Sequence, residues 1–214
     1  MNVNKFLLAP EDCVMLFIDH QPTEYFGITS HPPQTIRNNV VGMAKATIAF
    51  NVPFVLTSIA QTSFNGLIIE ELSEALKNTS PIDRTTINSW EDTRVVEKIK
   101  ESKRKKLLIS GLWTEVCATL TALSAKAEGY DVYIITDTCG GISPEAHERA
   151  IQRMIQAGVI PVTWLGVMLE WQRDWSRKST SAAVLEIAKE HSAPYGISIK
   201  NNQDIANHIV NPKN

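Results

Sequence analysis

The sequence contains only three cysteines among its 214 residues, and they are widely separated. An odd number of unpaired cysteines argues against a disulfide scaffold and is typical of a reducing compartment. Neither C-x-x-C nor H-x-x-x-H spacing occurs, so the sequence gives no support for a zinc site. The dinucleotide pattern G-x-G-x-x-G is also absent, which excludes an ordinary nicotinamide-cofactor enzyme, and no cofactor is expected.

Long apolar runs and excess charge are lacking as well. The hydrophobic patch in the first ten residues is too short for a signal peptide or a membrane-spanning helix, so we expect a cytosolic protein without membrane contact. The formal net charge is only -2, and the one basic cluster, Lys103–Lys106, is interpreted as a solvated turn. Nucleic acid is therefore not an expected partner, whereas a small and roughly neutral ligand is.

A regular alternation of strand and helix patterns is what the sequence does have. The strand-like apolar runs are Cys13–Asp19, Pro53–Ser58, Ile82–Arg84, Leu107–Ser110, Asp131–Thr136 and Val159–Trp164. The helix-like segments between and after them are Arg37–Phe50, Ile69–Lys77, Glu91–Ser102, Ala118–Glu128, Ser143–Ala157 and Ser179–Glu190. This alternation predicts a three-layer α/β/α fold of Rossmann-like type, with a six-stranded, mostly parallel sheet and helices on both faces.

The chain is expected to form a single domain over residues 1–214. Pro161 near the start of the last strand favours an edge position for that strand. From about residue 192 the sequence is polar and bounded by proline, so the C-terminal tail is either loose or packs on another subunit.

Three residues with useful chemistry follow strands of this predicted sheet, namely Asp19, Arg84 and Cys117. Open parallel sheets bind ligands beyond the carboxyl ends of their strands, so these side chains should share one edge. Cys117 would lie in the first turn of a helix, where backbone N–H groups and the helix dipole favour a thiolate. A thiol, a carboxylate to take its proton and an orienting cation would form a nucleophilic unit. Simpler roles remain open, because each residue could instead serve a turn, a surface ion pair or core packing.

Other residues near the same edge are weaker candidates. His20 should face away from Asp19, because adjacent strand residues point to opposite faces. Cys139 could line the site or act in redox chemistry, whereas Cys13 reads as core. The residues predicted to line the substrate pocket from neighbouring loops are Gln21, Phe26, Phe64, Asn88 and Trp90.

Several motifs in order along the chain resemble the isochorismatase-like cysteine hydrolases. They are the strand ending in Asp19-His-Gln21, Arg84 followed by Ile87-Asn-Ser-Trp90, and Gly111-Leu-Trp-Thr-Glu-Val-Cys117. The segment Trp164–Trp175 is similar to the YcaC-like branch in particular. The resemblance covers nearly the whole chain up to about Trp175 and becomes thin after Ser179.

The resemblance implies an isochorismatase-like hydrolase fold and a metal-independent enzyme that cleaves a carbon-nitrogen bond of a small amide through a thioester acyl-enzyme. It makes Cys117 the nucleophile and Asp19 the base, with Arg84 in the place of a lysine found in many amidases. It also implies a cis peptide at Trp113–Thr114 and an oxyanion hole formed by the amides of Thr114 and Cys117.

Two groups within the family bear on the expected metal content and reaction. Nicotinamidases hold a metal through an aspartate and histidines after the second strand, but Ile59–Gly66 contains neither residue type. Members that act on isochorismate lack the cysteine, so Cys117 argues against that reaction. YcaC-like proteins form octamers, which implies a homo-oligomer here, and Trp164–Trp175 would either line a subunit contact or pack within one subunit. The alternative function is a non-catalytic, small-molecule-binding or thiol-sensing protein on the same fold.

Overall fold

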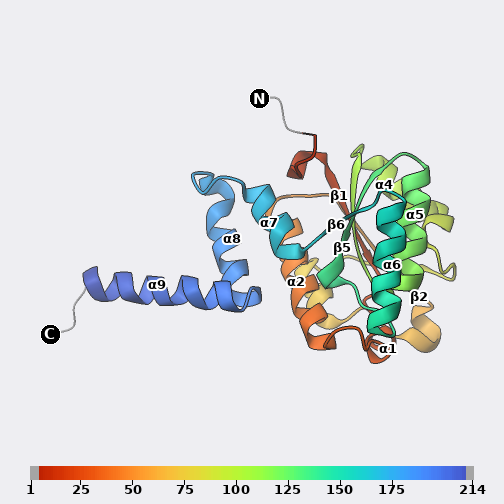
Figure 1. Ribbon diagram of the computed structural model, residues 1–214, viewed down its shortest axis with the longest axis horizontal. Helices are drawn as coiled ribbons and strands as arrows, with labels where there is room; N and C mark the ends of the chain where they lie inside the picture. The colour runs from red at the N-terminus through yellow and green to blue at the C-terminus, as the bar shows by residue number, and fades with distance from the viewer. Residues whose placement is uncertain (1–4, 211–214) are drawn as a thin grey trace.

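The computed structural model describes residues 5–210 and contains a six-stranded, entirely parallel sheet covered by helices on both faces (Figure 1). The strand order is β3-β2-β1-β4-β5-β6. The strands are β1 (Cys13–Ile18), β2 (Phe54–Ile59), β3 (Ile82–Arg84), β4 (Lys106–Gly111), β5 (Asp131–Ile135) and β6 (Ile160–Val162). The predicted three-layer fold is confirmed, and β6 lies at an edge as its proline indicated.

The helices follow the predicted alternation, with shifted ends and some additional elements. The longer helices are α2 (Pro33–Ala49), α4 (Thr93–Glu101), α5 (Thr119–Ala127), α6 (Pro144–Gln156), α7 (Trp164–Gln172), α8 (Lys178–His191) and α9 (Pro194–Val210). Shorter elements are η1 (Pro10–Asp12), α1 (Pro22–Phe26), η2 (Gln61–Asn65), α3 (Glu70–Ala75), η3 (Ser89–Glu91), η4 (Thr114–Ala118) and η5 (Thr136–Thr138). Helix α2 begins four residues earlier than predicted, because Pro33 suits the first helical position.

The core is divided into two layers by the alternation of side chains along the central strand β1. Met15 and Phe17 pack in a cluster with residues of α2, α7 and α8, whereas Leu16 and Ile18 pack with residues of α4, α5 and α6. Every residue of β1 is buried. Burial on both faces is why this strand reads as one continuous apolar run in the sequence.

The carboxyl ends of β1, β2 and β4 meet at the point where strand order reverses. Ile18 lies opposite Thr57 of β2 on one side and Gly111 of β4 on the other. In open α/β sheets a ligand site forms at such a reversal. The sheet therefore brings together the loops that follow these strands.

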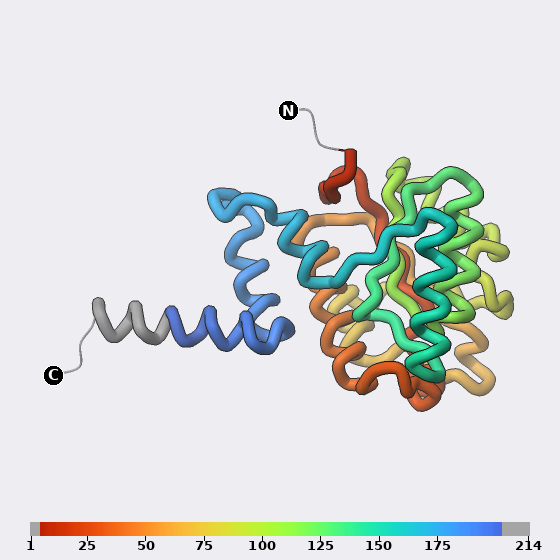
Figure 2. The backbone as a smooth tube through the Cα atoms, in the orientation of Figure 1, coloured from red at the N-terminus to blue at the C-terminus, as the bar shows by residue number. Residues whose placement is uncertain are grey.

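The described part of the predicted C-terminal tail is helical, and residues 211–214 lie outside the described residues. The described part forms helix α9, which contacts α8 and extends away from the sheet (Figures 1 and 2). In α7, Trp164 and Trp171 are buried in the core of the same subunit, so core packing accounts for both, while Trp175 beyond the helix is half exposed. Between residues 5 and 210, no helix combines the length and apolar character needed to cross a bilayer.

Candidate active site

Asp19 occupies the turn directly after β1 and is completely buried. Its φ angle is 57°, a left-handed conformation that aspartate tolerates better than most residues. The carboxylate accepts a hydrogen bond from Thr57 Oγ1 at 3.2 Å and forms an ion pair with Arg84. Burial raises the pKa of Asp19, and the charge of Arg84 and a hydrogen bond from the Cys117 thiol oppose that rise. The three predicted residues thus meet in one cluster.

Arg84 ends the short strand β3 and is almost fully buried. Its Nη2 donates to Asp19, and its Nη1 donates to the carbonyl oxygens of Thr86 and Ile87. These acceptors fix the guanidinium plane beside the carboxylate. Arginine keeps its proton at all relevant pH values, so Arg84 orients and stabilises Asp19 but does not transfer a proton.

Cys117 lies in η4, a π-helical turn between β4 and α5, and not in the first turn of α5 as predicted. Burial, and then the negative charge of Asp19, raise the pKa of the Cys117 thiol to about 12. The prediction of a thiolate stabilised by a helix start is therefore wrong for the resting site. The geometry describes a neutral thiol that donates a hydrogen bond to a carboxylate.

The peptide geometry before Cys117 corrects two further predictions. The cis peptide bond is Leu112–Trp113, one residue earlier than the expected Trp113–Thr114. The Thr114 amide donates to the carbonyl oxygen of Gly140 at 2.9 Å, so it is not available to bind an oxyanion. This bond forms because Leu112 and Gly140 pair as an isolated parallel bridge, which extends the sheet past the end of β4.

Glu24 is a site residue that the sequence interpretation did not include. It lies in α1 with only 8% of its surface exposed. Burial, followed by the negative charge of Asp19, raises its pKa to about 7, whereas a hydrogen bond from Asn65 lowers it. Its charge also acts on the Cys117 thiol. Pro22 at the start of α1 was the available signal, because proline is common at the first position of a helix.

Three of the predicted pocket residues lie on segments that follow β1 and β2: Gln21 directly before α1, Phe26 at the end of α1 and Phe64 in η2. The Gln21 side chain is buried, accepts from the Ile59 amide at 2.8 Å and donates to the Gly66 carbonyl at 2.6 Å, so it holds the segment after β2. Phe26 is 91% exposed and lines a cavity of about 550 Å³ between α1 and α2. Phe64 is 69% exposed. Contact of these two phenylalanines with the substrate stays a prediction.

Asn88 and Trp90 are both buried and form contacts with α5 and the turn after it. Asn88 accepts from the Trp90 amide at 3.0 Å and donates to Ser124 at 3.0 Å. The Trp90 indole packs edge-on against Tyr130 and donates to Glu128 at 2.8 Å. Their polar groups are engaged in holding η3 against α5, and the predicted contact with substrate is untested.

The remaining polar candidates at the edge have structural partners. His20 is buried between Tyr25 and Ser110, each at 2.9 Å, and burial lowers its pKa to about 3, which keeps the ring neutral. Cys139 is completely buried, and burial raises its pKa to about 12. Neither residue is exposed for substrate or oxidant.

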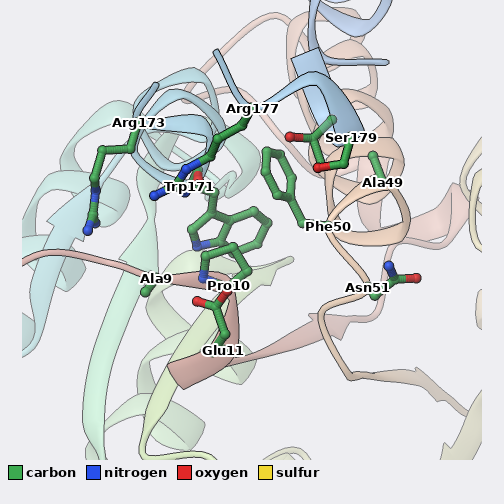
Figure 3. A pocket seen from close by; sticks show the side chains of 11 residues that line it. Ala9, Pro10, Glu11, Ala49, Phe50, Asn51, Trp171, Arg173, Arg177 and Ser179 are labelled. Atoms are coloured by element: carbon green, nitrogen blue, oxygen red, sulfur yellow. Dashed lines mark hydrogen bonds between the residues drawn. The ribbon is translucent and has the colours of Figure 1, made fainter. Parts of the chain in front are cut away.

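A separate cavity of about 410 Å³ lies at the opposite end of the sheet (Figure 3). Its lining includes Pro10, just before β1, and Asn51, just before β2, together with Trp171 and Arg177. These positions precede the strands, whereas Asp19, Arg84 and Cys117 follow or end theirs. The cavity is therefore distinct from the cluster at the carboxyl ends.

Comparisons with known proteins agree with the motifs and the fold. The isochorismatase domain matches residues 13–165. The chain is 35% identical over 179 residues to the probable hydrolase YcaC of Escherichia coli strain K12, covering 83% of this chain and 86% of that protein.

Two crystal structures are close in fold. That of YcaC from Escherichia coli, described as an octameric hydrolase of unknown specificity, matches with a TM-score of 0.89 at 32% identity. YcaC from Pseudomonas aeruginosa, with hexane-2,5-diol and covalent acrylamide, matches with a TM-score of 0.88 at 31% identity. Each match covers 94% of this chain and 98% of the other.

Proposed function

This chain belongs to the isochorismatase family of hydrolases, and from that premise we propose that it is a cysteine hydrolase that cleaves the carbon-nitrogen bond of a small amide. The observation that carries the proposal is the buried contact between the Cys117 thiol and the Asp19 carboxylate, with Arg84 paired to that carboxylate. A thiol next to a base that is itself oriented by a third group is the general arrangement of covalent catalysis.

Because the resting thiol is neutral, the proton must leave as the sulfur attacks. Asp19 takes the proton from Cys117 Sγ while Sγ bonds to the carbonyl carbon, and it later gives that proton to the departing nitrogen. Ammonia or an amine leaves and a thioester remains on Cys117. Asp19 then takes a proton from water as the water oxygen bonds to the thioester carbon. The C–S bond breaks, Asp19 returns that proton to Sγ, and the carboxylic acid product and the free thiol are released.

The carbonyl oxygen becomes negative during attack and needs hydrogen-bond donors. The Thr114 amide is already engaged, whereas the Trp113 amide makes no hydrogen bond within the part of the chain that the structure describes. We therefore assign the oxyanion hole to the amides of Trp113 and Cys117. Each such donor lowers the barrier by about 3 kcal/mol.

The reaction is proposed to need neither metal nor cofactor. In the residues described, no group of three or more histidine, cysteine, aspartate or glutamate side chains is placed to hold a metal ion. Activity that survives dialysis against a chelator is the expected result, and activity that returns only with added metal would contradict it.

A homo-oligomer is part of the same proposal. The related Escherichia coli protein is described as octameric, and here α9 extends away from its own domain with Ile197 60% exposed (Figure 1). An apolar side chain on a projecting helix favours contact with another subunit. We propose a cytoplasmic octamer of a single-domain chain, in which α9, within the tail that starts at about residue 192, serves as the subunit arm.

Of the two non-catalytic alternatives, small-molecule binding and thiol sensing, the thiol-sensing role fits the site less well. Sensor cysteines are exposed and have a low pKa, whereas burial raises the pKa of Cys117 to about 12. A hydrolase tolerates this value because Asp19 accepts the proton during attack.

Ammonia release from a panel of small primary amides tests the proposal. Turnover by the wild type that disappears in Cys117→Ala is expected, and Cys139→Ala is the matched control because Cys139 is also buried but lies outside the cluster. Equal turnover in Cys117→Ala and wild type would refute the assignment of the nucleophile.

A further inference from the structure

Glu24 places a second carboxyl in the site, and no step of the proposed reaction uses it. The charges of Asp19 and Arg84 both act on Glu24, and Glu24 in turn acts on the Cys117 thiol. Asp19 already forms an ion pair with Arg84, so the one guanidinium is committed. Glu24 forms no salt bridge with any of the described side chains. Once ionised, it leaves the cluster with one uncompensated negative charge.

The position of Glu24 is fixed by contacts from both sides of α1. The Trp113 indole, from the segment that leads to Cys117, donates to the Glu24 carbonyl oxygen at 3.0 Å. Thr23 Oγ1 donates to the carbonyl oxygen of Phe64 in η2 at 2.9 Å. Helix α1 is thus held between the nucleophile segment and η2, and the Glu24 carboxyl lies close enough to Asp19, Arg84 and the Cys117 thiol for their charges to act on one another.

Two buried polar atoms of the cluster have no hydrogen-bond partner among the described residues. Arg84 Nε is a donor without an acceptor, and Asn65 Oδ1 is an acceptor without a donor. Both residues are at least 98% buried, and each contacts a carboxyl of the cluster, Arg84 at Asp19 and Asn65 at Glu24. Buried polar groups without partners are rare and costly, so a ligand that forms hydrogen bonds with these atoms is stabilised.

The chemistry of these atoms defines the ligand. Next to Glu24, the Asn65 oxygen adds a second acceptor, and two acceptors together with a net negative charge select a cationic group that carries several N–H donors. An anionic substrate would instead meet two carboxylates, and the Arg84 guanidinium already donates to Asp19 and to two backbone carbonyl oxygens. The site therefore discriminates by charge.

We infer that Glu24 and Asn65 bind a positively charged nitrogen group of the substrate, so that the preferred substrates are small amides carrying an amine, amidine or guanidine. This inference rests on the proposed amide hydrolysis at the same site. Glu24 and Asn65 act in binding and specificity, while Cys117 and Asp19 carry the reaction.

Matched substrates test the charge preference. β-Alaninamide is cationic, butanamide replaces its ammonium by a methyl group, and succinamate is anionic. At pH 8 the wild type should show kcat/KM at least about tenfold higher for β-alaninamide than for butanamide, and succinamate should be poorest. Glu24→Gln, which keeps the size of the side chain and can still bond Asn65, should bring the ratio of the first two close to one.

Control variants and pH make the test specific. Glu97→Gln removes an exposed carboxylate on α4 and should keep the wild-type ratio. In the wild type the ratio should fall between pH 8 and pH 6, because the pKa of Glu24 is about 7, with Asp19 and Arg84 as the charged groups that face it. A ratio that is the same in wild type and Glu24→Gln would overturn the inference.

Thiol labelling separates this inference from the proposed hydrolysis. Cationic 2-aminoethyl and anionic 2-sulfonatoethyl methanethiosulfonate differ in charge and need no catalytic turnover to modify Cys117. The cationic reagent should react at least about tenfold faster in wild type, and the preference should shrink in Glu24→Gln. Labelling that shows this preference without any amide turnover would refute the hydrolase proposal alone. Turnover combined with equal labelling by both reagents would refute the charge inference alone.

Discussion

Replacing Asp19 by asparagine removes the negative charge that contacts the Cys117 thiol. In the wild type, burial and then the Asp19 charge raise the thiol pKa to about 12. Without that charge, the neighbouring Arg84 guanidinium remains and favours the thiolate. The pKa of Cys117 should therefore fall in Asp19→Asn, although the variant has lost its base and should turn over substrate 10²- to 10⁴-fold more slowly, an order-of-magnitude expectation for lost base catalysis.

The size of the shift follows from the contact between the two groups. Unit charges about 4 Å apart interact by about 4 kcal/mol at an effective dielectric constant of about 20. Since about 1.4 kcal/mol corresponds to one pKa unit, the thiol pKa should fall by roughly two to three units. The variant also removes the ion-pair partner of the buried Arg84, which should lower the free energy of unfolding by about 3–5 kcal/mol.

Alkylation of Cys117 by iodoacetamide, followed by peptide mass spectrometry from pH 6 to pH 11, measures this pKa. In wild type the rate should still be rising at pH 11, whereas in Asp19→Asn it should reach a plateau below that pH. Asp83→Asn is the matched control, because Asp83 directly precedes Arg84 on β3 but accepts hydrogen bonds from Ser58 and the Gln61 amide instead. Its alkylation profile should match that of the wild type.

The double variant Asp19→Asn/Arg84→Gln is the control for loss of stability in the single variant. It removes both charges, so stability should partly recover while the Cys117 pKa lies between those of wild type and the single variant. Faster alkylation with slower turnover is the combination that a direct contact requires. An unchanged or higher Cys117 pKa in a folded Asp19→Asn variant would refute the contact between the two groups.

Three further outcomes are expected. The pKa of His20 is about 3 in the folded state, against about 6.5 when unfolded, so the unfolded chain binds more protons below pH 6.5. The free energy of unfolding should then fall by about 1.4 kcal/mol per pH unit between pH 6 and pH 3, and denaturant titrations of His20→Gln should lack this contribution. Gly27→Ala would place a Cβ 2.7 Å from Trp113 Cζ2 and displace the indole. Because Trp113 belongs to the segment that positions Cys117, kcat/KM should fall by on the order of tenfold to a hundredfold, and an unchanged kcat/KM would contradict that positioning role. Removal of residues 194–214 should lower the number of subunits per assembly, calculated from the mass measured by light scattering. An assembly that still contains eight truncated subunits would exclude α9 as the subunit arm.

Much of the fold follows from local physics that the sequence displays. Strand β1 is buried on both faces, which is why its residues form one apolar run in the sequence. Asp19, the first charged residue after this run, marks the end of the strand. The same reasoning located Arg84 at the end of β3. Because parallel strands end at one edge, residues far apart in the chain could be placed together before their contacts were known.

Features that depend on contacts between distant segments were not predictable in this way. Cys117 precedes a regular helix in the sequence, but its backbone forms a π-helical turn, and burial next to Asp19 makes the thiol harder to ionise. The Thr114 amide donates its hydrogen bond to the Gly140 carbonyl oxygen, and no local sequence pattern predicts this pairing. The place of Glu24 in the site depends on contacts of α1 with Trp113 and Asn65, which are distant in the sequence, so no local pattern indicates it.

The most direct test of the central role of Cys117 is the mass of the protein during turnover. The wild type is mixed with an amide that it hydrolyses, quenched in acid within milliseconds to seconds, and analysed as intact protein and as peptides. A covalent acyl group on the peptide that contains Cys117, equal in mass to the substrate minus ammonia and absent in Cys117→Ala, is the predicted result. Continued ammonia release by Cys117→Ala, with no acylated peptide in the wild type, would contradict it.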